Sequence, residues 1–256
     1  MSTPSETRGG GRKAWLVPAI VIVVAVALIA TVLLMNRSDD PAGSGAAGAA
    51  EGSESQIQGP AAQDPGAPDA AAADFTAVES REEGDPLAVG PVDAPVGLVV
   101  FSDYQCPYCA KWSQETLPLM MEHVEAGDLR IEWRDLHLFG PASERASRAA
   151  YAAARQDAFL EYHDALFAGG EPRPEAELSD EALASLADDL GLDAEEFAAD
   201  YNSPETAEVV GDHAQLGIDL GAYSTPAFIL GGQPIMGAQP AEVFQDAFDT
   251  ALAENR

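Results

Sequence analysis

Hydrophobic and polar positions divide this 256-residue chain into three stretches with different patterns. Residues 14–35 form an uncharged and largely apolar run. Residues 36–84 consist mostly of Ala, Gly, Pro, Ser and acidic residues, with few side chains that could form a core. Residues 85–256 carry the alternating and helical patterns of folded structure, and their number suits one domain.

The apolar run at 14–35 is long enough to cross a membrane. A helix of this length would extend about 33 Å, because each residue adds about 1.5 Å. Basic residues precede the run, so we expect residues 1–13 to stay in the cytoplasm and the rest of the chain to be exported. A cleaved signal peptide is the alternative, with Ala25-Val26-Ala27 as candidate cleavage site, but signal peptides have shorter apolar cores. We predict an uncleaved single-pass anchor in the cell membrane, followed by a disordered tether at 36–84.

The pattern from 96 to 136 predicts a strand, a helix and a second strand. Residues 96–102 (VGLVVFS) are an apolar run with β-branched residues, typical of a buried strand. Residues 107–125 have apolar positions at helical spacing, and Pro118 should kink that helix. Residues 129–136 (LRIEWRDL) alternate apolar and charged positions, which predicts the second strand. A βαβ unit with parallel strands follows from this order.

A long helical stretch separates this half from the C-terminal half. Residues 141–220 carry helical signals throughout. Residues 227–236 then predict a hairpin with a Gly231-Gly232 turn, and 240–253 predict a closing amphipathic helix. The expected fold class is therefore α/β, with a helical insertion between a βαβ half and a ββα half. Three residues are predicted N-caps of helices within the insertion: Ser179, Asp193 and Ser203.

The charge of the chain excludes some classes of partner. The chain has 13 Lys and Arg residues against 43 Asp and Glu residues, which gives a net charge of −30. Such an excess of negative charge argues against binding to nucleic acid or to anionic lipid surfaces. A solvated acidic surface is the simplest interpretation.

Both cysteines of the chain lie at the junction of the first predicted strand and the helix after it. A disulfide between Cys106 and Cys109 would close a very short loop, so stabilisation is a poor reason for the pair. With Cys106 at the N-cap and Pro107 at the first helical position, the amides of Tyr108 and Cys109 and the helix dipole favour a thiolate. We predict that Cys106 has a lowered pKa and attacks disulfides, whereas Cys109 is more buried and less reactive.

Other uses of the two cysteines fit less well. A structural zinc ion needs four ligands, and the chain has no second cysteine pair. A c-type haem needs His directly after the second cysteine, where this chain has Ala110. A copper site with a distant histidine stays open as an alternative, although the four histidines show no ligand spacing.

Pro226 stands directly before the strand pattern at 227–230. Because proline cannot donate to a β-ladder, it belongs at a sheet edge or in a turn. An ordinary turn and a turn with a cis Thr225–Pro226 bond are both compatible with this position.

Six segments between Asp85 and the C-terminus resemble the DsbA-like branch of the thioredoxin superfamily. The segments are DPLAVGPVDAPV (85–96), FSDYQCPYC (101–109), RIEWRDL (130–136), EYHDALF (161–167), STPAFILGG (224–232) and GAQP (237–240). The resemblance implies a thioredoxin fold, with Cys106 as the attacking thiol and Cys109 as the resolving thiol. It further implies that Pro226 is a cis-proline facing them and that Thr225 offers backbone hydrogen bonds to an extended substrate peptide.

The chain departs from the family pattern at two positions. Many oxidases of the family have His where this chain has Tyr108, and that His stabilises the thiolate. Some members carry an acid where this chain has Val100. The nearest acid is Asp103, which could accept a proton from Cys109 or, as is more common for Asp in a loop, cap a turn.

We therefore predict an extracytoplasmic thiol–disulfide oxidoreductase that uses neither a metal nor an organic cofactor. The favoured role is an oxidase that donates its Cys106–Cys109 disulfide to reduced exported proteins. The resemblance implies reoxidation by a membrane quinone-linked protein, such as a vitamin K epoxide reductase or DsbB-type protein. The alternatives are a disulfide reductase or isomerase of the same fold, and a copper-binding thioredoxin-like protein.

Overall fold

The structure is a computed structural model, and it describes residues 75–256. The predicted cytoplasmic segment 1–13, the anchor 14–35 and the tether up to residue 74 lie outside the described residues. Within 75–256, no helix has the length and apolar character needed to cross a bilayer.

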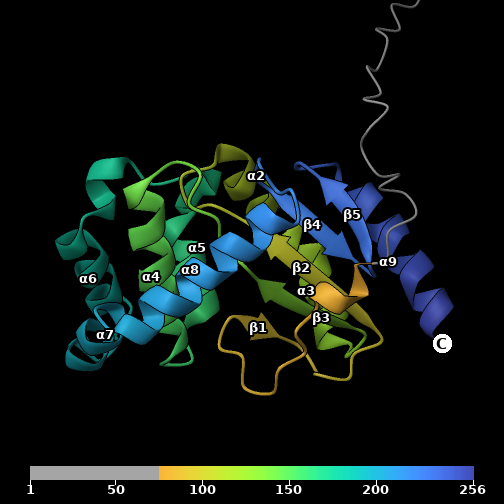
Figure 1. The fold of residues 1–256 in the computed structure, drawn as a ribbon, viewed down its shortest axis with the longest axis horizontal. Helices are drawn as coiled ribbons and strands as arrows, with labels where there is room; N and C mark the ends of the chain where they lie inside the picture. The colour runs from red at the N-terminus through yellow and green to blue at the C-terminus, as the bar shows by residue number, and fades with distance from the viewer. Residues whose placement is uncertain (1–74) are drawn as a thin grey trace, which may run out of the picture. The chain divides into compact units, whose positions relative to one another are not determined.

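A five-stranded mixed sheet lies at the centre of residues 75–256 (Figure 1). β2 and β3 are parallel, and the other neighbouring strands are antiparallel. All six residues of β2 are buried, which explains why its sequence is a continuous apolar run. The predicted βαβ unit and C-terminal hairpin are confirmed. The strands lie in the order β1 (Ala88–Val89), β3 (Leu129–Trp133), β2 (Val96–Phe101), β4 (Ala227–Leu230) and β5 (Gln233–Met236).

Helices cover both faces of the sheet (Figure 1). The first face is covered by α2 (Pro107–Glu115), α3 (Leu117–Glu125) and α9 (Ala241–Asn255), and α8 (Pro204–Asp219) crosses the second. On the first face, the rings of Trp112 and Phe228 lie 4.8 Å apart, and Phe244 of α9 meets Phe228 at the same distance. On the second face, Val99, Phe101 and Leu136 form a separate apolar cluster.

The helical insertion is also confirmed. It contains α4 (Pro141–Ala154), α5 (Phe159–Leu166), α6 (Asp180–Asp189), α7 (Ala194–Tyr201) and α8. The three predicted N-caps accept hydrogen bonds from the first turns of their helices: Ser179 from the Ala182 amide, Asp193 from the Glu195 and Glu196 amides, and Ser203 from the Thr206 amide.

The helix predicted over 107–125 is two helices in the structure. α2 ends at Glu115 and α3 begins at Leu117, so the break lies at Thr116 rather than at Pro118 itself. Pro118 has no N–H to donate, and proline is tolerated in the first turn of a new helix. The proline therefore starts α3 instead of kinking one long helix.

The second predicted strand differs from its prediction in two ways. β3 ends at Trp133 rather than at residue 136, and a two-residue strand that no sequence pattern indicated, β1, pairs with it. The charged positions of β3 are buried as well, with Arg130 4% and Glu132 2% exposed. Alternation usually marks a strand with one solvated face, so a buried polar network must satisfy these two side chains.

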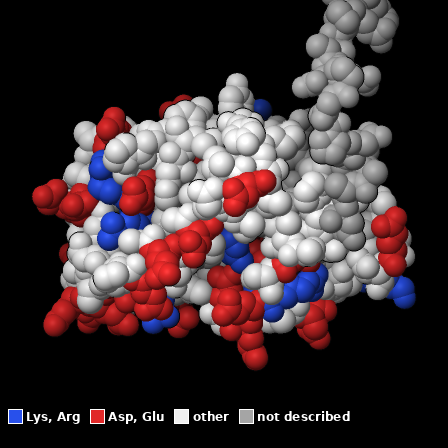
Figure 2. Space-filling model, viewed as in Figure 1, with Lys and Arg blue, Asp and Glu red and all other residues white. Residues whose placement is uncertain are grey.

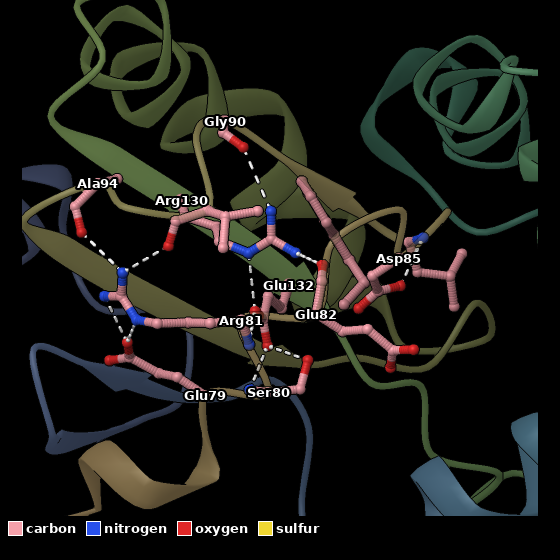
Figure 3. Close-up of polar contacts among 12 residues, drawn as sticks. Glu79, Ser80, Arg81, Glu82, Asp85, Gly90, Ala94, Arg130 and Glu132 are labelled. Carbon is pink, nitrogen blue, oxygen red and sulfur yellow. Dashed lines mark hydrogen bonds and ion pairs between the residues drawn. The ribbon is translucent and has the colours of Figure 1, made fainter.

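That network is supplied by residues predicted to be the end of the tether (Figure 3). The amides of Ser80 and Arg81 donate to the Glu132 carboxylate over 2.9 and 2.8 Å. Arg130 and Arg134 donate to the same carboxylate over 2.8 and 3.0 Å. Although burial opposes it, these hydrogen bonds and positive charges hold the pKa of Glu132 below its ordinary value. The folded region therefore begins before the predicted boundary at residue 85.

Charged side chains are distributed unevenly over the surface shown in Figure 2. Acidic side chains gather along α8 and over the insertion, whereas few charges appear over α2 and β4. Cys106 is the N-cap of α2 and Cys109 lies in its first turn, so both cysteines belong to this weakly charged part of the molecule.

Candidate active site

Cys106 lies at the N-cap of α2, and Pro107 takes the first helical position, as predicted. β2 ends at Phe101, and a tight loop leads to the cysteine, whose amide donates to the Asp103 carbonyl over 2.9 Å. No side chain caps α2. The amides of Tyr108 and Cys109 in the first helical turn instead stabilise negative charge on the Cys106 sulfur.

A loop far along the chain brings Thr225 against Cys106. The Thr225–Pro226 peptide bond is cis, and the Cys106 Sγ donates to the Thr225 carbonyl oxygen over 3.2 Å. The Pro226 carbonyl accepts from the Gly237 amide over 2.8 Å, which joins this loop to the end of β5. The Thr225 hydroxyl is buried and has no hydrogen-bond partner among residues 75–256. The structure thus brings together Cys106, Thr225 and Pro226, and leaves one hydroxyl available to a charged sulfur.

The Cys106 thiol is acidic in this environment. Its pKa is lowered to about 6, chiefly because the Cys109 thiol can donate to the Cys106 thiolate. Burial opposes this effect, whereas the Thr225 hydroxyl and the amides of Cys109 and Tyr108 add to it. At neutral pH most Cys106 side chains are therefore thiolates, which is the nucleophilic form.

Cys109 has the opposite character. Burial raises its pKa well above the ordinary value, and the Cys106 sulfur raises it further, against the effect of the Ser102 hydroxyl and the Asp103 amide. Both cysteines are free thiols. Their exposed fractions are nearly equal, at 2% for Cys106 and 1% for Cys109. The predicted asymmetry between the two thiols therefore lies in their pKa values and hardly at all in their exposure.

The side chain between the two cysteines is open to solvent. Tyr108 is 63% exposed. Lys111, one turn further along α2, pairs with Glu115 over 3.8 Å at the surface. The groups that lower the pKa of Cys106 are thus a thiol, a hydroxyl and backbone amides.

Asp103 lies in the turn that precedes Cys106. Its Oδ1 accepts from the Gln105 amide over 2.9 Å, and its Oδ2 accepts from the Phe139 amide over 3.3 Å. Both carboxylate oxygens therefore bind backbone amides, as in the turn-capping role. Burial raises the pKa of Asp103, and these hydrogen bonds oppose the rise.

A buried polar cluster that no sequence pattern indicated lies behind the cysteines. The Tyr104 hydroxyl and the Ser113 hydroxyl lie 3.2 and 3.0 Å from the two ring nitrogens of His163. Burial lowers the pKa of His163 to about 4, so its ring is neutral at physiological pH. The cluster ties the loop before Cys106 and helix α2 to α5 of the insertion. Because the histidine lies in the helical EYHDALF segment, its pattern indicates only a core position.

No candidate metal centre accompanies the thiols in the described part of the chain. Residues 75–256 contain no group of three or more Cys, His, Asp or Glu side chains that could hold a metal ion.

Exposed apolar side chains come from the segments that surround Cys106. Tyr108 belongs to the cysteine motif, Tyr223 lies two residues before Thr225, and Met236 pairs with Ala227 at the end of the hairpin. Phe139 is 54% exposed, and its carbonyl accepts from the Gln105 side chain over 3.3 Å. The site therefore opens onto an apolar, weakly charged surface.

Comparison with known proteins connects this geometry to one family. Residues 97–249 match the DSBA-like thioredoxin domain. The structure of BdbD from Bacillus subtilis superimposes with a TM-score of 0.59, covering 66% of this chain and 94% of that one at 23% identity.

Curated relatives of two kinds are similar to part of this chain. The Na(+)/H(+) antiporter NhaA of Herminiimonas arsenicoxydans is 36% identical over 154 residues, which make up 59% of this chain and 23% of the antiporter. The chain thus spans only about a quarter of such relatives. The probable disulfide bond formation protein D of Bacillus anthracis is 26% identical over 150 residues, 57% of this chain and 69% of that protein.

Proposed function

Because this chain belongs to the DsbA-like thioredoxin family, whose members are thiol–disulfide oxidoreductases, we propose that it is an oxidase donating the Cys106–Cys109 disulfide to reduced exported proteins. The observation that carries this proposal is the contrast between the two thiols. Cys106 is acidic and lies at a helix N-terminus against Thr225, whereas Cys109 lies one turn further on with a raised pKa.

The exchange proceeds in two steps. A substrate thiolate attacks the Cys106 Sγ of the disulfide, so a mixed disulfide forms and Cys109 leaves as a thiolate that takes up a proton. A second substrate thiolate then attacks the substrate sulfur of the mixed disulfide, and Cys106 leaves as a thiolate. The substrate loses two electrons and gains a disulfide, while the protein becomes a dithiol.

The acidity of Cys106 favours the oxidising direction. A thiol of low pKa is a good leaving group, and a stabilised thiolate stabilises the reduced protein. Each property makes donation of the disulfide more favourable. A pKa of about 6 is intermediate between the thiols of strong oxidases and of reductases, so a reductase or isomerase remains the second candidate.

We propose that an extended substrate peptide binds beside Thr225 and Pro226. The Thr225 carbonyl already accepts a hydrogen bond from the Cys106 thiol, and a peptide in β-conformation can use the same backbone group when that thiol is in a mixed disulfide. The exposed apolar residues from the surrounding segments suit unfolded substrates, which present apolar side chains: Tyr108, Phe139, Tyr223 and Met236.

We further propose that the catalytic domain works outside the cytoplasm, with residues 14–35 as an uncleaved anchor, 1–13 in the cytoplasm and residues up to about 74 as a tether. Reoxidation of the dithiol requires an electron acceptor. The proposed acceptor is a quinone-linked membrane protein of the vitamin K epoxide reductase or DsbB type, which the anchor would keep close.

The reduction potential and the effect of Cys106→Ser together test this function. The full-length protein is equilibrated with glutathione buffers, and oxidative folding of a reduced substrate is assayed with the wild type and with Cys106→Ser. We expect a potential nearer to about −120 mV than to about −270 mV, the values of a strong oxidase and a reductase. We also expect no folding activity in Cys106→Ser and a trapped mixed disulfide in Cys109→Ser. A potential near the reductase value would indicate that the protein reduces disulfides. A Cys106→Ser variant that keeps folding activity would contradict the proposed function altogether.

A further inference from the structure

Asp135 continues β3 beyond its last residue, beside the loop that carries the cysteines. The Arg134 amide donates to the Val100 carbonyl over 2.8 Å, and the Leu136 amide donates to the Ser102 carbonyl over 2.6 Å. These bonds extend the parallel register of β2 and β3, in which Val100 pairs with Trp133. The same register places Asp135 beside Ser102, one strand spacing of about 4.8 Å away.

The side chain of Asp135 lies on the same side of the sheet as Cys109. Leu136 belongs to the apolar cluster on the second face, with Val99 and Phe101. Trp133, Val100 and Cys109 belong to the core on the first face. Because side chains alternate along an extended chain, Asp135 faces the first side together with Trp133. Ser102, its cross-strand neighbour, is the residue whose hydroxyl favours the Cys109 thiolate.

Asp135 is buried without a full set of hydrogen bonds. It is 3% exposed, and its Oδ1 has no hydrogen-bond partner among residues 75–256. Burial raises the pKa of Asp135 to about 8, and the negative charge of Asp103 adds to this rise. The Ser147 hydroxyl of α4 and the Arg134 guanidinium oppose it. A carboxyl group in this state can both donate and accept a proton near neutral pH.

The other titratable groups near Cys109 are less suited to proton transfer. Both Asp103 oxygens accept from backbone amides, and both His163 nitrogens contact hydroxyls. Burial raises the pKa of Tyr104 well above its ordinary value, and the charges of Asp135 and Cys109 are among the causes, which places both groups near this ring. Asp135 is the buried acid in this region with an oxygen that has no hydrogen-bond partner within residues 75–256.

We propose that Asp135 exchanges a proton with Cys109 through the hydroxyl of Ser102, which is the cross-strand neighbour of Asp135 and favours the Cys109 thiolate. In the oxidase direction, a substrate thiolate forms a bond to the Cys106 sulfur as the Cys106–Cys109 bond breaks. The Asp135 carboxyl gives its proton to Ser102, which passes its own to the departing Cys109 sulfur. In the reverse direction, Cys109 loses its proton to the carboxylate while it attacks the mixed disulfide. Asp135 is a proton-relay residue and is oxidised in neither direction.

This inference rests on the proposed function, and its test compares two matched variants. Asp135→Asn keeps the shape and removes the exchangeable carboxyl proton. Asp164→Asn is the control, because the charge of this α5 acid also acts on Tyr104, but Asp164 is not a sheet neighbour of Ser102. The oxidised full-length proteins are mixed with reduced glutathione, and the rate of disulfide reduction is followed from pH 5 to pH 9.

We expect Asp135→Asn to reduce the rate at least about tenfold below pH 7, because a general acid typically contributes about 10²–10⁴-fold. The ratio of wild-type to variant rate should fall towards one above pH 8, where Asp135 is ionised and has no proton to give. Asp164→Asn should match the wild type at every pH. Taking this ratio removes the pH dependence of glutathione itself.

The outcomes separate the two proposals. A ratio of one at all pH values, or a loss that does not change with pH, would overturn the role of Asp135 while leaving the oxidoreductase function intact. A wild-type disulfide that does not react with glutathione would instead contradict the proposed function. If Asp135→Asn fails to fold, as judged by thermal unfolding, Ser102→Ala carries the same expectation, because it interrupts the same relay.

Discussion

The Cys106 Sγ lies 3.2 Å from the carbonyl oxygen of Thr225, a residue 119 positions further along the chain. This contact joins the start of α2 to the cis-proline loop before β4. It places a buried hydroxyl, which has no partner within residues 75–256, near the most acidic thiol of the site. The Cys106 sulfur is therefore held between a helix N-terminus and the loop at which we propose that substrate peptides bind.

The first prediction concerns that hydroxyl. Thr225→Val should raise the pKa of Cys106 by about 0.5–1 unit, because one hydrogen bond to the thiolate contributes roughly 1 kcal/mol. The oxidised protein, which has no thiolate, should be no less stable, since the Thr225 hydroxyl has no hydrogen-bond partner among residues 75–256. Thiolate absorbance at 240 nm, titrated in the reduced protein, measures the pKa. Tyr108→Phe is the control that also loses a hydroxyl, but an exposed one, and an equal shift in both variants would contradict the assignment.

The second prediction concerns the pH dependence of stability. The pKa of Cys106 in the folded state, about 6, lies below its ordinary value. The thiolate therefore stabilises the reduced protein at pH values above the ordinary thiol pKa, and this stabilisation is lost as the pH falls through about 6. We expect the stability of the reduced protein, relative to Cys106→Ser, to decrease by up to about 1.4 kcal/mol for each pH unit in this range. Urea unfolding from pH 5 to pH 9 measures it.

The oxidised protein provides the control for this prediction, because a disulfide does not titrate. Its unfolding free energy should lack the component that depends on Cys106. If the unfolding free energies of the reduced and oxidised proteins had the same pH dependence, the low pKa assigned to Cys106 would be wrong.

Local features of the chain were predictable from the sequence, and long-range polar contacts were not. The position of Cys106 at the N-cap follows from neighbouring residues alone, a buried strand and then Pro107. The hairpin at 227–236 and the caps of the insertion are equally local. That Pro226 faces the cysteines was expected only from the family resemblance, because periodicity carries no information about residues so far apart.

The polar interior shows why the rest could not be predicted. Glu132 stands in an alternating strand, and its burial depends on the backbone amides of Ser80 and Arg81, which come from a segment with the composition of a tether. The burial of Asp135 could not be predicted for the same reason, because the pattern LRIEWRDL does not indicate that its last acid lies beside Ser102. Charged residues are usually exposed, so a sequence pattern assigns them to the surface unless their partners are known.

The third prediction tests the buried network around Glu132. Glu132→Gln should destabilise the protein by about 3–5 kcal/mol, because it leaves Arg130 and Arg134 without their shared carboxylate. The pKa of Cys106 should not change. Urea unfolding measures the stability, and thiolate titration measures the pKa of Cys106.

Asp128→Asn is the control for this prediction. It breaks the exposed pair with Arg256 and should cost less than about 1 kcal/mol of stability. Equal losses in the two variants would show that the network contributes no more than a surface pair.

The fourth prediction uses two glycines of α8 in different surroundings. A Cβ on Gly217 would collide with Leu136 and lie 3.0 Å from a ring carbon of Phe101, whereas a Cβ on Gly211 would meet nothing within 4 Å. Gly217→Ala should therefore destabilise the protein by roughly 1–3 kcal/mol, since α8 must move away from the second face of the sheet. Gly211→Ala should be neutral or stabilise by up to about 1 kcal/mol, because alanine favours a helix interior over glycine. Thermal unfolding of both variants compares the same substitution in one helix, so the difference in stability isolates the close approach of α8 to the sheet.

Because Leu136 follows Asp135, the Gly217→Ala variant should also slow reduction of the disulfide by glutathione. An unchanged rate would show that the end of β3 tolerates this displacement.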